Sequence, residues 1–127
     1  MRTTAAILSI ILATALGGCH ETQIMCPAIF ILQNGVSVHV KDSVTGAFAA
    51  SGAKIVARSA TYTDSSALEA GHPESDSQTL GAGHRPGVYT VTVSKAGYQD
   101  WVRANVSVTA ADKCELRNTD LTALLQP

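Results

Sequence analysis

Hydrophobic and polar residues alternate over much of this chain, which is typical of β-strands with one buried face. The clearest case is the stretch VSVHVKD, in which valines at every second position are separated by Ser, His and Lys. Four segments share this period: residues 36–42, 53–59, 87–95 and 101–109. The residues predicted to face inward are Val36, Val38, Val40, Tyr89, Val91, Val93, Val102, Ala104, Val106 and Val108.

Two further segments near the ends of the domain also have strand character. Residues 27–32 form a short apolar run and are expected to be the first strand. In residues 114–125, Leu116 and Leu121 are five positions apart, so they do not share one face of a regular strand. We therefore expect a bulge or bend near residues 117–120.

The connections carry turn residues. The sequence Ser-Val-Thr-Gly at 43–46 predicts a turn in which Gly46 takes a positive φ. Residues 60–84 are rich in Ser, Asp, Gly and Ala and have little period of their own. They are expected to form an exposed excursion, with room for one or two edge strands around residues 61–63 and 77–80.

Short alternating segments separated by turns, without a helical period of useful length, predict an all-β fold. We expect an antiparallel β-sandwich of about seven strands. The chain has 127 residues and a formal net charge of −1, with neither a basic stripe nor an acidic tail. This charge pattern gives no support to nucleic-acid binding.

The first residues have the pattern of an export signal. Arg2 precedes a continuous apolar run over residues 5–16, which is too short to cross a bilayer but fits a cleaved signal peptide. The run ends in Leu-Gly-Gly-Cys at 16–19, which resembles the bacterial lipobox. That resemblance implies cleavage before Cys19 and acylation of its thiol, with palmitate among the expected chains. The alternative is an ordinary secretory signal that happens to meet a cysteine.

An acylated Cys19 would hold the protein on a membrane, because two or more acyl chains give stable anchoring. Residue 20 is His rather than Asp, and by resemblance to lipoproteins this favours release to the outer membrane, facing the periplasm. The domain organisation expected from these patterns is a lipoprotein signal peptide at 1–18, a lipid-anchored segment at 19–27 and the β-sandwich at 28–127.

With Cys19 acylated, two cysteines remain, Cys26 and Cys114, and they bracket nearly the whole domain. In an oxidising periplasm we expect them to form a disulfide. A loop of this length would stabilise the fold by about 4 kcal/mol in the chain-entropy model. A metal site is the alternative, but the close Cys or His spacing of such sites is missing.

Two separated motifs resemble the carboxypeptidase regulatory-like domain, a prealbumin-like (transthyretin-like) sandwich of about seven strands. The first motif is VHVKDSVTGAFAASGAKIVAR and the second is RPGVYTVTVSKAGYQDWVRANVSVT, and together they cover roughly residues 34–110. The matching positions are Asp42, Thr45, Gly46, Gly52, Ala53, Pro86, Gly87, Tyr89, Val91, Gly97 and Tyr98. The family often has a proline after the Thr-Gly pair, whereas Ala47 and Phe48 follow here. The resemblance implies a non-enzymatic accessory module.

The residues offer little catalytic or metal-binding chemistry. The chain has no G-x-S-x-G motif, no H-E-x-x-H motif and no EF-hand spacing. His72 and His84 fall in the polar excursion, where solvated loop residues are the simplest interpretation. We therefore expect no catalytic residues, no bound metal and no cofactor.

Two functions remain open. The first is a non-enzymatic envelope lipoprotein whose sandwich is a structural or protein-interaction module, with sheet edges near residues 60–84 open to strand addition. The second is a binding module for a glycan or another small ligand. It would use Trp101, Tyr62 and Asp100 together with the polar excursion, although a half-buried core role for the tryptophan is the more common one.

Overall fold

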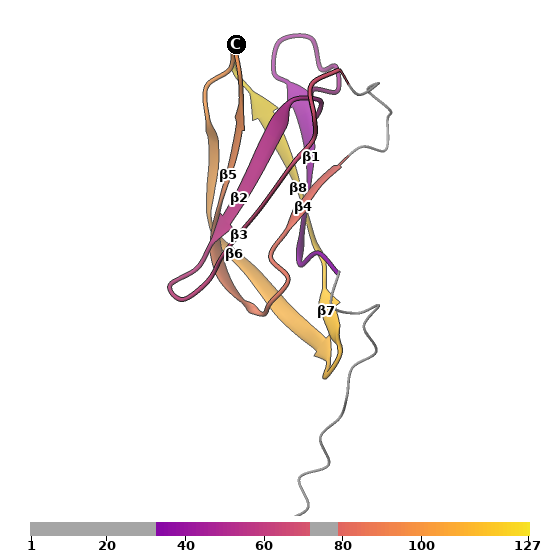
Figure 1. Cartoon of the computed structure of the whole chain (residues 1–127), viewed down its shortest axis with the longest axis vertical. Coiled ribbons are helices and arrows are strands. Elements are labelled where there is room, and N and C mark those ends of the chain that lie inside the picture. The colour runs from indigo at the N-terminus through magenta and orange to yellow at the C-terminus, as the bar shows by residue number, and fades with distance from the viewer. Residues whose placement is uncertain (1–32, 72–78) are drawn as a thin grey trace, which may run out of the picture.

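The computed structural model describes residues 33–71 and 79–127, which form two layers of β-strands (Figure 1). These residues contain eight strands and no helix. The strands are β1 (Val36–Asp42), β2 (Ala53–Arg58), β3 (Thr63–Ala67), β4 (Thr79–Ala82), β5 (Gly87–Lys95), β6 (Trp101–Asp112), β7 (Glu115–Arg117) and β8 (Thr119–Leu125). The predicted all-β sandwich is confirmed.

One layer is a three-stranded sheet in the order β4-β1-β8, and the other is a five-stranded sheet in the order β3-β2-β5-β6-β7. All paired strands run antiparallel except β1 and β8, which pair in parallel from Val36 opposite Thr119 to Asp42 opposite Leu125. A parallel pair needs a long crossover, and here strands β2 to β7 together supply it. The expectation of wholly antiparallel sheets therefore fails at this one pair.

The core lies between the two sheets and follows the predicted alternation closely. Buried and more exposed residues alternate along β1, β2 and β5, as a strand with one covered face requires. Most core side chains are valine, alanine or leucine, with Tyr89 as the largest fully buried one. The core residues are Val36, Val38, Val40, Ala49, Ala50, Ala53, Ile55, Ala57, Leu80, Ala82, Tyr89, Val91, Val93, Val106, Val108, Ala123 and Leu125.

Strand β6 departs from the prediction in its first half. Val106 and Val108 are buried as expected, but Val102 and Ala104 are exposed. The register with β5 shifts between Tyr89 and Val91, and Asn105 has a φ of 58°. Between the pairs Tyr89–Val106 and Val91–Arg103, β6 has one residue more than β5. This β-bulge reverses the inward phase of β6 at that point. Asparagine is one of the few residues that tolerates this left-handed conformation.

The other local predictions have mixed outcomes. The expected interruption near residues 117–120 is present, because β7 ends at Arg117 and β8 begins at Thr119 in the other sheet. The polar excursion holds two edge strands, β3 and β4, which begin near the positions expected. Gly46 has the predicted positive φ, at 71°. The strand predicted at residues 27–32 lies outside the described residues.

The two ends of the sandwich differ in the segments that meet there (Figure 1). We call the end that contains Gln33, the β2–β3 turn and β7 the N-terminal pole. The opposite end contains the β1–β2 connection, the β5–β6 turn and the C-terminus, and we call it the C-terminal pole. There the Gln99 N–H donates to the Gln126 carbonyl over 2.8 Å, and the Ser43 N–H donates to the Leu125 carbonyl over 2.9 Å.

Candidate functional site

A polar bridge between the two sheets lies at the C-terminal pole and centres on Asp42, the last residue of β1. Its Oδ1 accepts the N–H groups of Val44 and Thr45, both over 2.8 Å. Its Oδ2 accepts the hydroxyl of Tyr98, in the β5–β6 turn, also over 2.8 Å. One carboxylate therefore organises the turn that follows β1 and ties it to the five-stranded sheet.

These hydrogen bonds have opposite effects on the two titratable partners. The Thr45 N–H, the Tyr98 hydroxyl and the Val44 N–H all favour the carboxylate, so the pKa of Asp42 lies below its ordinary value. The hydrogen bond to Asp42 is the main cause that raises the pKa of Tyr98. Both shifts favour a charged Asp42 and a neutral Tyr98, so the hydrogen bond between them is maintained at neutral pH.

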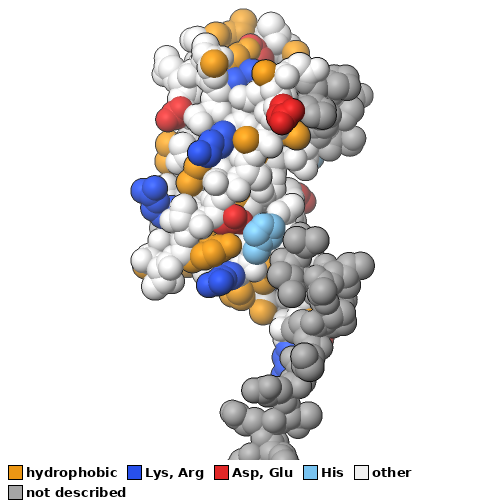
Figure 2. All heavy atoms as spheres, viewed as in Figure 1, with side chains coloured by type: hydrophobic (Ala, Val, Ile, Leu, Met, Phe, Trp, Pro, Cys, Tyr) orange, Lys and Arg blue, Asp and Glu red, His pale blue; other side chains and the backbone are white. Residues whose placement is uncertain are grey.

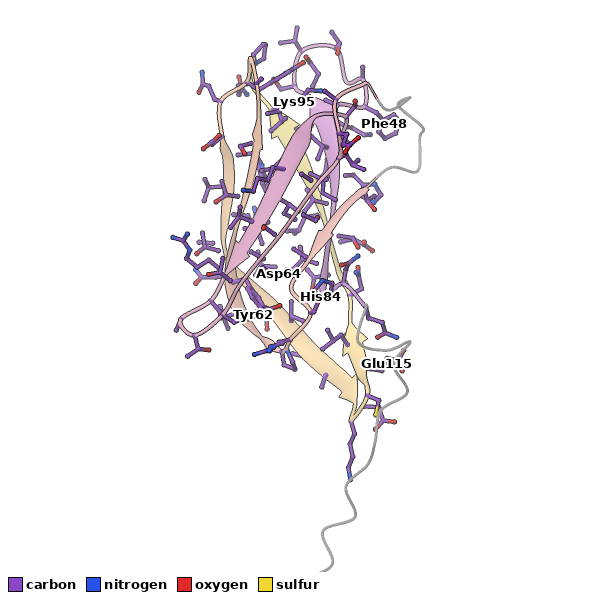
Figure 3. All side chains as sticks on the ribbon, viewed as in Figure 1. Phe48, Tyr62, Asp64, His84, Lys95 and Glu115 are labelled. Carbon is purple, nitrogen blue, oxygen red and sulfur yellow. The ribbon has the colours of Figure 1, made fainter. Side chains whose placement is uncertain are left out.

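Two lysines reinforce the same pole through carbonyl and ring contacts. The Lys95 ammonium donates to the carbonyl oxygen of Ala49 over 3.0 Å and lies 5.6 Å from the centre of the Tyr98 ring. Lys41 lies 5.2 Å from the centre of the Phe48 ring. Figure 3 shows Lys95 and Phe48 at this end of the sandwich. These contacts hold the β1–β2 connection against the sheets.

A second polar cluster lies at the N-terminal pole, where Asp64 of β3 and His84 lie beside one another (Figure 3). The Nε2 atom of His84 is 3.2 Å from Oδ2 of Asp64, and its Nδ1 atom is 3.0 Å from the carbonyl oxygen of Gln33. The same carboxylate oxygen accepts the Gly83 N–H over 2.8 Å. Because both ring nitrogens face protein oxygens, neither is free to act as a general base.

Tyr62 and Arg85 extend this cluster at the end of the β2–β3 turn. The Arg85 guanidinium lies 4.5 Å from the centre of the Tyr62 ring, a cation–π geometry. The Arg85 carbonyl accepts the hydroxyl of Tyr89 over 2.7 Å. Burial is the main cause that raises the pKa of Tyr89. The cluster therefore joins the turn before β3, the segment before β5 and the core.

The residues predicted to bind a ligand do not form one site. Trp101 begins β6 at the C-terminal pole and lies opposite Val93, whereas Tyr62 lies beyond the last residue of β2 at the other pole. Both aromatic rings are half-buried and pack against the core. Asp100 is exposed beside Trp101. The structure thus separates Tyr62 from the other two residues by the length of the sheet.

Of the three cysteines, only Cys114 lies within the described residues. Cys114 lies in the turn between β6 and β7 and is disulfide-bonded. Cys19 and Cys26 lie outside the described residues. The pairing of Cys26 with Cys114 and the acylation of Cys19 therefore stay predictions.

The histidines of the polar excursion were expected to be solvated loop residues. For His84 this interpretation is wrong, because Asp64 and Gln33 hold its ring. The contacts join positions 20 and 51 residues apart, so no local spacing could have revealed them. His72 lies outside the described residues.

The part of the chain that the structure describes has no group of three or more His, Cys, Asp or Glu side chains able to hold a metal ion. Within residues 33–71 and 79–127, no helix is long and apolar enough to cross a membrane. Charged side chains are scattered on the face shown in Figure 2, where no large patch of one sign gathers.

The chain was also compared with known proteins. No family model matches it, and the search of curated proteins finds no match either.

Proposed function

We propose that this protein is a non-enzymatic lipoprotein of the bacterial cell envelope, anchored to the outer membrane through Cys19 and facing the periplasm. Its β-sandwich, of the carboxypeptidase regulatory-like type, serves as a structural or protein-interaction module. The anchor rests on the Leu-Gly-Gly-Cys sequence at 16–19 and the apolar run before it.

The observation that carries the proposal is the attachment of the chain to one pole of the sandwich. The side-chain oxygen of Gln33 accepts the Leu116 N–H over 3.1 Å. The backbone carbonyl oxygen of Gln33 lies 3.0 Å from Nδ1 of His84. The Gly35 N–H donates to the Gly83 carbonyl over 3.0 Å, and Asn118 donates to the Asn34 carbonyl over 2.9 Å. Residues 33–35 are therefore bonded to both sheets at the N-terminal pole.

In an anchored protein, the chain would therefore enter the sandwich at its N-terminal pole. The N-terminal pole would lie nearer the membrane, and the C-terminal pole would point away from it. Hydrogen bonds from several segments would also transmit load from the anchor into both sheets rather than into one strand. Such an arrangement suits a module that presents a surface to another envelope protein.

The sheet edges support the interaction role. Strand β3 is at one edge of the five-stranded sheet, and β4 is at one edge of the three-stranded sheet. Both lie within the polar excursion of residues 60–84, which was expected to provide open edges. An exposed edge can accept a strand from a partner through backbone hydrogen bonds.

The contacts at the C-terminal pole support the proposed family type. Asp42, Thr45 and Tyr98 are among the positions on which the resemblance rests, and they form one hydrogen-bonded unit. Residues separated by more than fifty positions in the sequence thus share one structural role. This is the behaviour expected of a motif that specifies a sandwich corner.

The anchor is tested by measuring the intact mass of the protein extracted from membranes, with and without reductant. The proposal is supported if the chain begins at Cys19, carries the added mass of acyl chains, and gains the mass of two hydrogen atoms when its disulfide is reduced. The Cys19→Ser variant is the matched control and should leave the membrane fraction. An unmodified chain in the soluble fraction would show that the lipobox interpretation is wrong.

The interaction role is tested by photo-crosslinking in intact cells. A crosslinker placed at Ser65, on edge strand β3, should form an adduct with one envelope protein, identified by mass spectrometry. A crosslinker at His39, on the central strand of the three-stranded sheet, should not give that adduct. The same adduct from both positions, or from neither, would contradict strand addition at β3.

A further inference from the structure

The outward face of the five-stranded sheet contains a shallow hollow of about 240 Å³, lined by Val56, Arg58, Thr90 and Thr92. The strand register explains this grouping. Val56 lies opposite Thr92, and Arg58 lies opposite Thr90, so the four side chains form two neighbouring cross-strand pairs on one face. The alternate residues of both strands point into the core.

The bulge in β6 borders this hollow. Tyr89 lies opposite Val106 and Val91 lies opposite Arg103, so Thr90 has no residue directly opposite it on β6. The gap in pairing leaves the Thr90 side of the hollow beside Asn105, the residue with a positive φ. The hollow is therefore a consequence of the fold at a position where the regular sheet is interrupted.

The face around the hollow is positively charged. On the outward positions of β2, β3, β5 and β6 as far as Thr109, the charged residues are Lys54 and Arg58, and Asp and Glu are absent. Among the described residues, none forms an ion pair or hydrogen bond with the Arg58 guanidinium. The site thus offers an unpaired guanidinium, which binds carboxylates through two parallel hydrogen bonds.

The remaining lining fits the rest of an acidic side chain. The hydroxyls of Thr90 and Thr92 can donate hydrogen bonds to a carboxylate. Val88 and Val102, on the two sides of the hollow, are 58% and 57% exposed and can cover an aliphatic stem. The volume is below the range of roughly 300–1,000 Å³ for small-molecule pockets, so it suits one side chain better than a cofactor.

We propose that this hollow binds a glutamate side chain of an extended partner peptide, with Arg58 pairing the carboxylate. The interaction module proposed above would then recognise its partner through an acidic segment on this sheet face, as well as through the edges. The inference rests on the interaction role but not on the lipid anchor, so the mass measurement and the experiment below can fail independently.

The test is an NMR titration of the purified mature protein with the peptide acetyl-Ala-Glu-Ala-amide, followed through backbone amide shifts. We expect saturable shifts at Arg58, Thr90 and Thr92. The matched peptide acetyl-Ala-Gln-Ala-amide, at the same ionic strength, should not produce them, because it lacks the charge that the guanidinium pairs.

Two variants locate the interaction. Arg58→Gln should weaken binding of the glutamate peptide by about tenfold, as expected for the loss of a charge-assisted hydrogen bond. Lys54→Gln is the control, because Lys54 is an exposed cation on the same strand and face but does not line the hollow. Its affinity should change by less than about twofold.

Any of three results with the peptides would overturn the inference. They are the absence of saturable shifts at the hollow, equal binding of the two peptides, and equal losses in the Arg58 and Lys54 variants. Inorganic phosphate is titrated in the same way as a control anion. If it causes the same shifts at the same concentration, the site binds anions in general and the assignment to a glutamate side chain is wrong.

Discussion

The two poles of the sandwich are both closed by a carboxylate that bridges different segments, but they are built from different kinds of contact. At the C-terminal pole, Asp42 bonds the backbone of residues two and three positions ahead and then reaches Tyr98. At the N-terminal pole, Asp64 and Gln33 bond groups between 19 and 83 positions away. One pole is organised around a local turn, and the other exists only when distant strands have met.

This difference affects how the poles contribute to stability. A local turn can form with little help from the rest of the chain, because few backbone dihedrals must be fixed. The N-terminal pole draws on β3, β7 and the segments before β1 and β5, so its contacts report on the assembled fold. Substitutions there should have larger effects than equivalent substitutions at the C-terminal pole.

The largest difference is expected between two tyrosines. Tyr89 is 1% exposed and its hydroxyl bonds the Arg85 carbonyl, whereas Tyr98 is half-buried. Tyr89→Ala should lower the free energy of unfolding by about 3–5 kcal/mol, because it leaves a cavity in the core. Tyr98→Ala should cost clearly less. Urea denaturation followed by circular dichroism measures both, and equal losses would contradict the comparison.

Two glycines provide the next test, because each pole needs one for a different reason. A Cβ at Gly35, near the N-terminal pole, would lie 2.5 Å from the Gly83 carbonyl oxygen and would also contact Val108. Gly46 has open space around it but a φ of 71°. We expect Gly35→Ala to cost about 3 kcal/mol through overpacking and Gly46→Ala about 1 kcal/mol through backbone strain.

A second substitution separates these two causes. Asparagine adopts the left-handed conformation more readily than alanine, so Gly46→Asn should recover part of the loss. Gly35→Asn should be at least as harmful as Gly35→Ala, because its side chain is larger. Thermal unfolding measures the four variants. If alanine is more destabilising than asparagine at both positions, or less destabilising at both, one mechanism operates at both poles.

The sequence predicted the features that local pattern determines. Alternation identified Val36, Val38 and Val40 as core residues, and the turn after Asp42 was recognisable from its Thr-Gly pair. The same alternation wrongly predicted that Val102 faces inward, because the bulge at Asn105 depends on pairing with β5. Period-two patterns carry no information about such a shift until the neighbouring strand is known.

The functional predictions divide in the same way. Trp101 and Tyr62 were grouped because a glycan site would need exposed aromatic side chains, but strand direction places the two residues at opposite poles. The hollow at Arg58 and Thr90 arises from cross-strand register, which a single sequence does not specify. Sites that depend on register or on long-range contacts therefore required the structure.

Asp64 tests the N-terminal pole more locally. Asp64→Ala removes the acceptor of the Gly83 N–H and the partner of His84, so it should cost about 1–2 kcal/mol. Hydrogen exchange of the Gly83 amide should accelerate with it. Asp100→Ala, at the exposed β5–β6 turn, is the control and should stay within about 0.5 kcal/mol of the wild type. Slow exchange at Gly83 in the variant would show that the carboxylate does not hold this pole.

The smallest effect is expected from the charge of Asp42. Its pKa is lower in the folded protein than the ordinary value of 3.8, because the Thr45 N–H, the Tyr98 hydroxyl and the Val44 N–H favour the carboxylate. Its contribution is therefore present above the ordinary value and is lost as the pH falls through the folded value. Urea midpoints measured from neutral pH downward should fall less steeply below about pH 4 in Asp42→Asn than in the wild type.

Asp100→Asn is the matched control for this measurement and should keep the wild-type slope. The effect is small because solvent reaches the carboxylate and screens its interactions. Parallel curves for wild type and Asp42→Asn would mean that the turn and Tyr98 bind a neutral side chain as well as a charged one. The C-terminal pole would then be held by hydrogen-bond geometry alone, and the contrast with the N-terminal pole would rest on contact distance along the chain rather than on charge.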